Sequence, residues 1–575
     1  MKKMSEYTLK RNGNIINKKY LEYFVPTVLT AMANNIAVMV DSILVGHMVG
    51  STSMAAINLL SPVIQFYFSM TILFGLGAST IISYAKGKND KATADKTFTV
   101  AFIALLFLSA VLMIVQFLLL DPIASIFTSI PELKRELILY YIPVIAGTPF
   151  SLLLPSVVHC IRSDGRPNFA SNLIILSNAV NLVMDIVLMG PFHMGIIGSS
   201  IATVIGNVIA FFMMLTHFKD RRNTLHFDFS IFQSIKEFFG KLGLLFATGV
   251  SGAVGTLLIT VKMFYLNSMV QNEAGKDGMV AMSVISMCQI FVSAFVTGAS
   301  QTMIPIVSVL LGEKDLTSIQ YAFRKAVLIL LAASVAIMLV IEGVPEFVAQ
   351  IFGDKTAQEM SFVVPALRIS SLSFPGLALS FLLMYYFMAT KKKFLSLTIS
   401  IVNGIAIIVP CAYVLSEIFG ITGIWLTLVV AQYGTLLFIA VMVFVIIKRS
   451  NGRYKNFYLI ESSKDNELLS FSVNSALSKE EIASYMTEKL ADIDYQAREK
   501  MILATAEVLA FVKELGAKRG KPVETDIRVN REGNDYIILL RSNGYEIKMA
   551  EMHHTICKSF DYTRVLGMNR IKIVV

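Results

Sequence analysis

The sequence predicts an all-α polytopic membrane protein with twelve transmembrane helices in two six-helix repeats, followed by a soluble α/β domain at the C-terminus. Three observations lead to this class. Hydrophobic residues make up 55% of the 575 residues, charged residues make up only 16%, and apolar stretches of about 20 residues, the length that crosses a bilayer, recur up to residue 448. After Lys455 the composition changes to polar and mixed charge, as in a soluble domain.

The apolar stretches divide the chain into three parts. We expect a first six-helix lobe in residues 1–235, a second six-helix lobe in residues 236–455, and a cytosolic α/β domain in residues 456–575. The expected spans lie approximately at residues 20–46, 55–84, 97–120, 137–160, 168–190, 195–218, 240–266, 278–311, 322–341, 362–390, 394–416 and 420–448.

The net charge of +10 reflects membrane topology rather than nucleic-acid binding. Lysine and arginine gather in alternate short loops, for example at residues 86–96, 219–222 and 391–393. Basic loops of this kind face the cytoplasm, so both termini are expected to be cytoplasmic. The four cysteines lie far apart in the sequence and indicate neither a disulfide framework nor a metal site.

The two halves of the membrane region repeat at a constant offset of 225 residues. At this offset GKND (87–90) aligns with GEKD (312–315), and GIIG (195–198) aligns with GITG (420–423). Because each half has six spans, the halves share one orientation and form a parallel repeat, an arrangement typical of transporters.

Two aspartates interrupt the apolar spans of the first half. A carboxylate in the bilayer centre costs about 2.5–3.5 kcal/mol on insertion scales, so such a residue faces a bundle interior or a wet cavity. Asp41 and Asp185 each lie shortly before the glycine that ends an outward-running span, which predicts similar depths in the membrane. Their counterparts at the repeat offset are Leu266 and Pro410, so cation chemistry is expected in the first lobe alone.

Neutral polar side chains accompany the two carboxyl groups. Asn34 lies seven residues before Asp41, while Asn178, Asn181 and Asp185 share one helix face. Two carboxyl groups that meet in a low-dielectric pocket do not both ionise cheaply, so either one holds a proton or the pair holds a cation. Asn181 and Thr203 would supply neutral oxygens to a cation. The alternative is that both aspartates are hydrogen-bonded structural carboxylates.

Other polar groups within the spans could line a cavity. Gln65 and Gln289 could face such a cavity or bond to neighbouring helices. Lys262 lies one turn before the counterpart of Asp41, and could line the second lobe or extend toward the membrane interface. None of these residues identifies a substrate.

Several segments together carry a family resemblance: VDSILVGHMVG (40–50), GLGAS (75–79), GKND (87–90), RSDGRPNF (162–169), NLVMDIVL (181–188) and GIIGSSIAT (195–203). Over roughly residues 15–450 the sequence resembles the multidrug and toxic compound extrusion (MATE) family of cation-coupled antiporters, in its prokaryotic branch. The resemblance implies a cation and proton site at Asp41, Asn181, Asp185 and Thr203.

The C-terminal domain has its own pattern. We expect a strand over 468–475, a helix over 478–492 with a capping box from Ser478 and Glu481, a long helix over 495–518, and a hairpin that turns near Gly533. This order resembles the histidine-kinase-like ATPase fold of small anti-sigma-factor-type kinases.

The residues that such an ATPase needs are incomplete. Glu507 is present on the long helix, but Phe511 stands where the family has a metal-binding Asn. The glycine-rich boxes are reduced to SNGYE (542–546) and VLGMN (565–569). We therefore expect a degenerate nucleotide site and a regulatory or partner-binding module.

These observations predict a multi-pass protein of the bacterial inner membrane that is not an enzyme and uses no cofactor. The resemblance implies antiport, in which H⁺ or Na⁺ enters and a small organic, usually cationic, compound leaves. One alternative is a membrane-anchored sensor or signalling protein with a kinase-like C-terminal domain. Another is an exporter of a lipid-linked or metabolite substrate.

Overall fold

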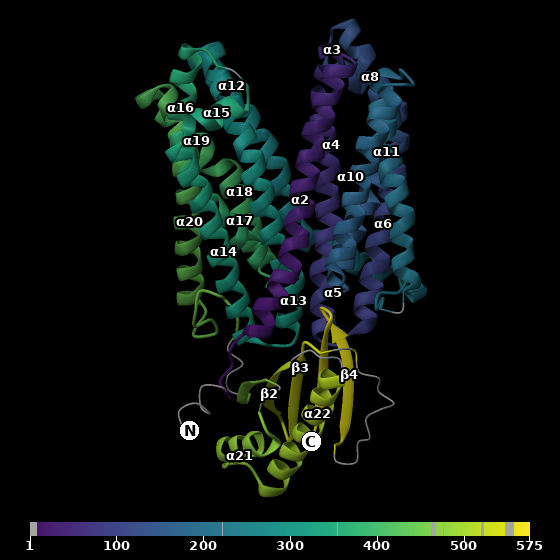
Figure 1. Cartoon of the computed structure of the whole chain (residues 1–575), viewed down its shortest axis with the longest axis vertical. Helices are drawn as coiled ribbons and strands as arrows, with labels where there is room; N and C mark the ends of the chain where they lie inside the picture. The colour runs from purple at the N-terminus through teal and green to yellow at the C-terminus, as the bar shows by residue number, and fades with distance from the viewer. Residues whose placement is uncertain are drawn as a thin grey trace.

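The computed structural model describes residues 9–220, 222–353, 355–461, 467–474, 477–518, 523–544, 546 and 557–575. Two bundles of helices stand side by side, and a β-sheet domain lies across one end of both (Figure 1). We call this end the sheet end and the opposite one the far end. The bundles converge near α5 and α13 at the sheet end and diverge toward α3 and α16 at the far end (Figure 1).

The first bundle contains the predicted first-lobe spans, several of them broken into shorter helices. The helices α8 and α9 are bent by 54° relative to each other, and the π-helical segment η1, whose five residues are all buried, separates α4 from α5. The elements are α2 (Asn14–Met48), α3 (Ser51–Leu59), α4 (Ser61–Thr71), η1 (Ile72–Leu76), α5 (Gly77–Gly87), α6 (Lys91–Leu118), α7 (Leu120–Phe127), α8 (Pro131–Ala146), α9 (Thr148–Ser163), α10 (Pro167–Met189), α11 (Gly195–Met214), η2 (Leu215–Lys219) and η3 (Phe229–Gln233).

The second bundle contains the predicted second-lobe spans, and its π-helical segment, η4, interrupts the fifth of them. Its first helix, α12, runs over 67 residues and is broken at Gly275, where φ is 53° and ψ is −135°. The elements are α12 (Ile235–Gln301), α13 (Met303–Gly312), α14 (Leu316–Gly343), α15 (Pro345–Ile351), α16 (Ala357–Ser371), α17 (Phe374–Ala389), α18 (Lys393–Ile401), η4 (Val402–Ala406), α19 (Ile408–Phe419) and α20 (Ile421–Arg449).

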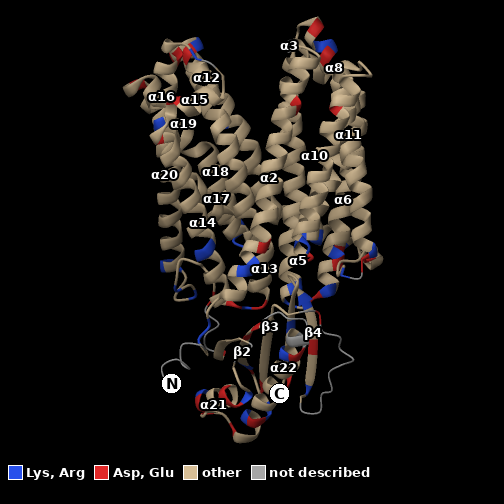
Figure 2. Cartoon of the chain, in the orientation of Figure 1, with Lys and Arg blue, Asp and Glu red and all other residues tan. Residues whose placement is uncertain are grey.

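The helices are long and apolar enough for a multi-pass membrane protein. In the described part of the chain, 9 helices could cross a membrane, or up to 11 if each of two bent helix pairs is one span. One of the nine, Ile235–Gly312, has 78 residues, more than twice the length that a bilayer requires. Figure 2 shows charged residues concentrated at the two ends of the bundles and in the sheet domain, with few in between.

The lobes meet at the sheet end through a seam between α5 and α13, which pack against each other. A Cβ atom on Gly87 would lie 2.1 Å from the Val309 carbonyl oxygen, and one on Gly312 would lie 2.4 Å from the Tyr84 carbonyl oxygen. Only glycine permits so close an approach of two backbones. These two glycines are equivalent in the repeat, so the seam has an approximate two-fold relation.

The C-terminal domain is a five-stranded sheet with two helices. The strand order is β1-β2-β3-β5-β4, and every described pair of neighbouring strands is antiparallel, so the domain is not of the α/β class that we expected. Its elements are β1 (Glu467–Asn474), α21 (Lys479–Lys489), α22 (Tyr495–Lys518), β2 (Glu524–Glu532), β3 (Asp535–Ser542), β4 (Ser559–Val565) and β5 (Met568–Val574).

Two local features predicted for this domain, the capping box and the hairpin turn, occur in the structure. The predicted capping box forms, since Ser478 accepts from the Glu481 backbone and Glu481 accepts from the Ser478 backbone. The β2–β3 hairpin turns at Gly533, whose φ is 63°. Alternate strand residues, such as Phe471, Ile527 and Leu540, pack with the two helices in one core. The other face of the sheet turns toward the lobes.

A buried ion network holds the sheet end of the first lobe. The Asp164 carboxylate pairs with Lys86 and lies 3.0 Å from His217 Nε2, and the Thr224 hydroxyl donates to it at 2.5 Å. Burial alone would raise the pKa of Asp164, but Lys86 and the hydrogen bonds from His217, Lys86 and Thr224 lower it to about 2. Asp164 therefore stabilises the fold at neutral pH, and this contribution is lost only as the pH falls below the ordinary range of an aspartate.

We expect Asp164→Asn to destabilise the protein by about 3–5 kcal/mol, because it leaves the buried Lys86 ammonium without its counter-charge. Thermal unfolding in detergent at neutral pH measures the effect. The control Asp121→Asn removes a carboxylate that is 73% exposed and paired with Lys134. An exposed pair of this kind contributes about 1 kcal/mol or less. Equal unfolding temperatures for the two variants would contradict this role of Asp164.

Candidate functional site

The structure brings Asp41 and Asp185 together between α2 and α10. The two carboxyl groups lie close enough to interact electrostatically. Asp185 is buried, with 1% of its side chain exposed, while Asp41 is half-buried. Among the described residues no group donates a hydrogen bond to Asp185 Oδ1. A buried carboxylate oxygen without a donor fits a place for a proton or a cation.

Asn181 and Thr203 complete the predicted group. The Asn181 amide donates to Asp185 Oδ2 at 3.1 Å and to Thr203 Oγ1 at 3.2 Å. Thr203 lies on α11, so three helices contribute to the group. In this orientation Asn181 presents its nitrogen to the carboxylate, and a 180° rotation of the amide would present its oxygen to a cation instead.

Two neighbouring residues escaped the sequence analysis. The Ser199 hydroxyl, one turn before Thr203, donates to Asp41 Oδ1 at 2.9 Å. The Tyr140 side chain on α8 is buried and lies close enough to interact electrostatically with both aspartates. The spacing of Ser199 and Thr203 could have indicated the serine, whereas nothing in the sequence around Tyr140 distinguishes it from a lipid-facing aromatic residue.

Asn34 and Asn178 form a second polar contact between α2 and α10. Asn178 Nδ2 donates to Asn34 Oδ1 at 3.0 Å. Each asparagine lies seven residues before an aspartate of the pair, which places the contact about two helical turns closer to the sheet end. The polar face that the sequence predicts is therefore continuous along this helix interface.

The remaining predicted lining residues do not join this group. Gln65 lies half-buried on α4, and Gln289 lies half-buried on α12. Lys262, also on α12, is buried, with 9% of its side chain exposed. No hydrogen bond between these three residues and the aspartate group occurs in the part of the chain that the structure describes.

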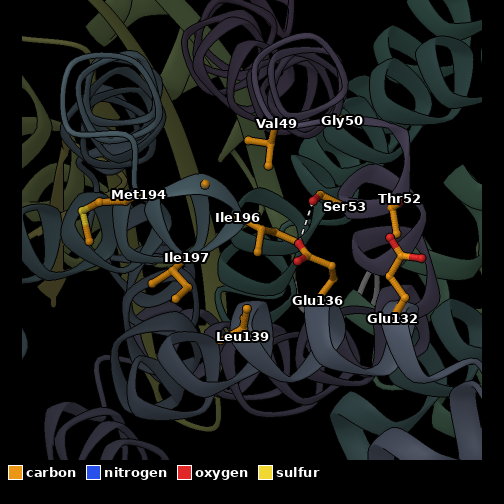
Figure 3. A pocket seen from close by; sticks show the side chains of 11 residues that line it. Val49, Gly50, Thr52, Ser53, Glu132, Glu136, Leu139, Met194, Ile196 and Ile197 are labelled. Carbon is orange, nitrogen blue, oxygen red and sulfur yellow. Dashed lines mark hydrogen bonds between the residues drawn. The ribbon is translucent and has the colours of Figure 1, made fainter.

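A cavity of about 340 Å³ lies near the far end of the first lobe. Its wall includes Glu132 and Glu136 of α8, and Figure 3 shows the Ser53 hydroxyl bonded to Glu136, at 2.7 Å. Glu136 is one turn from Tyr140, and Ile196 of the same wall is three residues before Ser199. Two helices thus connect this acidic cavity to the aspartate pair.

The residues predicted to remain from a nucleotide site lie on α22 and in the β4–β5 hairpin. Glu507 is exposed on α22, and Phe511 packs against the hydrophobic core of the domain. Val565–Asn569, expected as a remnant of a glycine motif, includes the turn of the β4–β5 hairpin. Tyr545 of the SNGYE segment and residues 547–556 lie outside the described residues. Groups of three or more His, Cys, Asp or Glu side chains that could hold a metal ion do not occur in the described chain.

Comparison with known proteins identifies the membrane region. The family model described as MatE matches residues 26–187 and again 252–414, which together are more than half of the chain and agree with the predicted repeat. The multidrug export protein MepA of Staphylococcus haemolyticus is 21% identical over 418 residues, covering 72% of this chain and 91% of the relative. MepA of Staphylococcus aureus is 21% identical over 446 residues, covering 77% and 96%.

Solved structures show the same fold. A multidrug resistance MATE family transporter in an outward-facing conformation superposes with a TM-score of 0.69 at 20% identity, covering 76% of this chain and 97% of the other. The D35N mutant of the Vibrio cholerae MATE transporter VcmN superposes with a TM-score of 0.70 at 18% identity, covering 78% and 99%. None of the matches supports the ATPase resemblance of residues 456–575. The chain is a multi-pass membrane protein that belongs to the MATE family of transporters.

Proposed function

We propose that this protein is a secondary antiporter that exports small organic, mainly cationic, compounds in exchange for H⁺ or Na⁺. The observation that carries the proposal is the buried pair of Asp41 and Asp185, with a carboxylate oxygen that no described group satisfies. Family membership and the multidrug export function named for the MepA relatives support the substrate class. Exporters of lipid-linked or metabolite substrates share these features and remain the alternative.

The proposed topology has twelve spans in two six-helix lobes. It follows from the eleven spans described above if Ile235–Gly312 crosses the membrane twice and reverses at Gly275. The sheet end carries the basic loops near Lys86, Lys219 and Lys391, so we assign it to the cytoplasm of a bacterial cell. Both termini lie there in this assignment, and the far end faces outward.

The coupling ion is proposed to enter from the far end through the acidic cavity. Glu132 and Glu136 give this cavity a negative potential that raises the local concentration of cations. From there Tyr140 and Ser199 lead to the aspartate pair. Occupation of the pair changes its charge and thereby biases the packing of α2 against α10, which couples the ion to the state of the transporter.

Efflux from proteoliposomes tests the function. A fluorescent organic cation such as ethidium is loaded, and its efflux is measured separately under an imposed pH gradient and an imposed Na⁺ gradient. We expect efflux under one of them, which identifies the ion. If neither gradient drives efflux in folded protein, the substrate is a different compound or the protein is the signalling alternative. Nucleotide binding by the full chain would support the signalling alternative.

Removing the charge of the acidic cavity should weaken ion entry without abolishing transport. For Glu136→Gln we expect the ion concentration that gives half-maximal efflux to rise about 2- to 10-fold at low ionic strength, and less at high salt because screening reduces the effect. The control Glu346→Gln removes an exposed carboxylate from α15 of the second lobe. A salt-independent change, or an equal change in the control, would contradict the proposed route.

A further inference from the structure

The face of the sheet that lacks helices is docked on the second lobe through buried charges. Asp315, in the loop between α13 and α14, lies 3.3 Å from Arg528 and 3.0 Å from Arg541. Arg541 also pairs with Glu313, and Arg528 donates to the Glu313 carbonyl oxygen at 2.9 Å. All four side chains are at least nine-tenths buried.

The segment before α2 joins the same cluster. Arg11 lies 2.9 Å from Asp315 and 3.1 Å from Asp526 of β2. Burial alone would raise the pKa of Asp315, but Arg11, Arg528 and Arg541 hold it well below the usual range of an aspartate. Asp315 therefore stays ionised throughout the physiological pH range, and the docking is not released by protonation of this group.

The internal repeat shows that this loop of the second lobe is specialised. Asp90 is the equivalent of Asp315, and both cap the next helix, by accepting from Thr93 and Ser318 respectively. Asp90, however, is exposed, while 1% of Asp315 is exposed. The cap function is common to both loops, whereas, among the described residues, the arginine cluster surrounds Asp315 and not Asp90.

The domain reaches the first lobe through the β4–β5 hairpin. Its turn lies against the α9–α10 loop, where a Cβ on Gly165 would lie 2.9 Å from the Gly567 nitrogen. The flanking Val565, Leu566 and Met568 are buried in a hydrophobic cluster formed mainly by second-lobe residues. In Figure 1, β4 rises toward the ends of α5 and α13. Away from the tip, Asn89 of the α5–α6 loop bonds to Asp561 of β4 at 2.5 Å.

One side chain spans the seam between the lobes. Arg570 of β5 donates to the Lys86 carbonyl oxygen of α5 at 3.4 Å, and its Nε lies 3.6 Å from Glu313 at the end of α13. These contacts lie on opposite sides of the backbone approach at Gly87 and Gly312. Separation of α5 from α13 would therefore break contacts between the domain and at least one lobe.

We propose that the C-terminal domain is an autoinhibitory clamp that holds the two lobes closed at the cytoplasmic side, and that its β4–β5 hairpin leaves the first lobe before this side opens. The proposal rests on the alternating access that the proposed antiport function requires. It goes beyond that function because it assigns the domain a direct role in the conformational change.

The contacts indicate which lobe releases the domain. The second lobe holds it through a buried, multiply paired cluster, and breaking such a cluster leaves uncompensated buried charges. The first lobe holds it through the backbone contact of Gly165 with Gly567, the Asn89–Asp561 bond at the surface and the long contact from Arg570. The domain should therefore move with the second lobe.

Two cleavable cross-links test this assignment in the full-length protein. The four native cysteines are replaced by alanine, and a short bis-methanethiosulfonate reagent links either Asn89→Cys with Asp561→Cys or Lys314→Cys with Glu532→Cys. The first link ties the domain to the first lobe. The second replaces an exposed ion pair of 3.8 Å and ties it to the second lobe.

The first link should lower gradient-driven efflux by at least about tenfold, and cleavage of the link with a reducing agent should restore it. The second link should leave efflux within about twofold of the unlinked protein. The difference arises because only the first link opposes the shift toward the open state. Undiminished efflux with the first link in place would overturn the clamp. Loss of efflux with the second link as well as with the first would overturn the inference that the domain leaves the first lobe and moves with the second lobe.

A measurement that does not need transport separates failure of the clamp from failure of the proposed function. Spin labels on Lys91→Cys and Arg324→Cys, at exposed positions of the two lobes, report the distance across the sheet end. Asp315→Asn, which retains a capping side chain, should increase the population of long distances at least about fivefold. Asp90→Asn is the matched control and should not. Equal distributions in both variants would overturn the clamp even if no substrate were transported.

Discussion

Asp185→Asn should abolish ion-driven efflux while the protein still folds and inserts. Asparagine has nearly the same shape as aspartate, so the packing of α10 is retained, but it neither accepts a proton nor balances the charge of a cation. Since the antiport cycle depends on occupation of this pair, efflux under either gradient should fall by about 100-fold or more, close to the rate of empty liposomes. Asp41→Asn should have an effect of the same kind.

The two carboxyl groups should behave as one unit. Because they interact directly, the double variant should be no worse than either single variant, which is the non-additivity expected of groups that share one function. The matched control is Asp121→Asn, the same change at a carboxylate of the first lobe that is 73% exposed. Efflux that persists in both Asp41→Asn and Asp185→Asn would mean that the two aspartates are hydrogen-bonded structural carboxylates.

Membrane-spanning features were predictable because their physical signals are strong. A bilayer demands long apolar stretches, and a carboxylate within one of them is costly enough to stand out, which is how Asp41 and Asp185 could be found. The asparagines could be found from helical periodicity. Ser199 and Tyr140 were missed because a serine or tyrosine in a span carries little cost and therefore little information.

The docking of the C-terminal domain could not be predicted from local patterns. Arg528 alternates with apolar residues along β2, which is also the pattern of solvent-facing side chains on a sheet, and Arg541 lies near the end of β3, where a charged residue is common. Their burial depends on Asp315, more than two hundred residues away. The β4–β5 hairpin was overlooked because its turn is Leu566–Gly567, with φ of 54° and 74°, rather than the Asn-Gly or Asp-Gly pair that usually signals such a turn.

Gly312→Ala should shift the protein toward the state in which the sheet end is open. The added Cβ would lie 2.4 Å from the Tyr84 carbonyl oxygen, and a backbone atom of a packed helix cannot move aside as a flexible side chain can. Overpacking of this kind costs about 1–3 kcal/mol, which changes a two-state equilibrium about 5- to 150-fold. Spin labels at positions 91 and 324 measure the shift.

Gly343→Ala provides the control, because no atom lies within 4 Å of a Cβ built at this position of α14. An unchanged distance distribution in Gly312→Ala would mean that the α5–α13 seam does not limit opening.

The seam and the clamp are proposed to oppose the same separation, and this distinguishes them from two unrelated structural contacts. If Gly312→Ala already opens the sheet end, the contacts of the hairpin with the first lobe are already broken. Asp315→Asn should then increase the population of long distances less than it does in the wild type. A double-mutant cycle between the two positions measures this difference as a coupling energy. Strict additivity would show that the domain stabilises the second lobe alone, without acting on the movement of one lobe against the other.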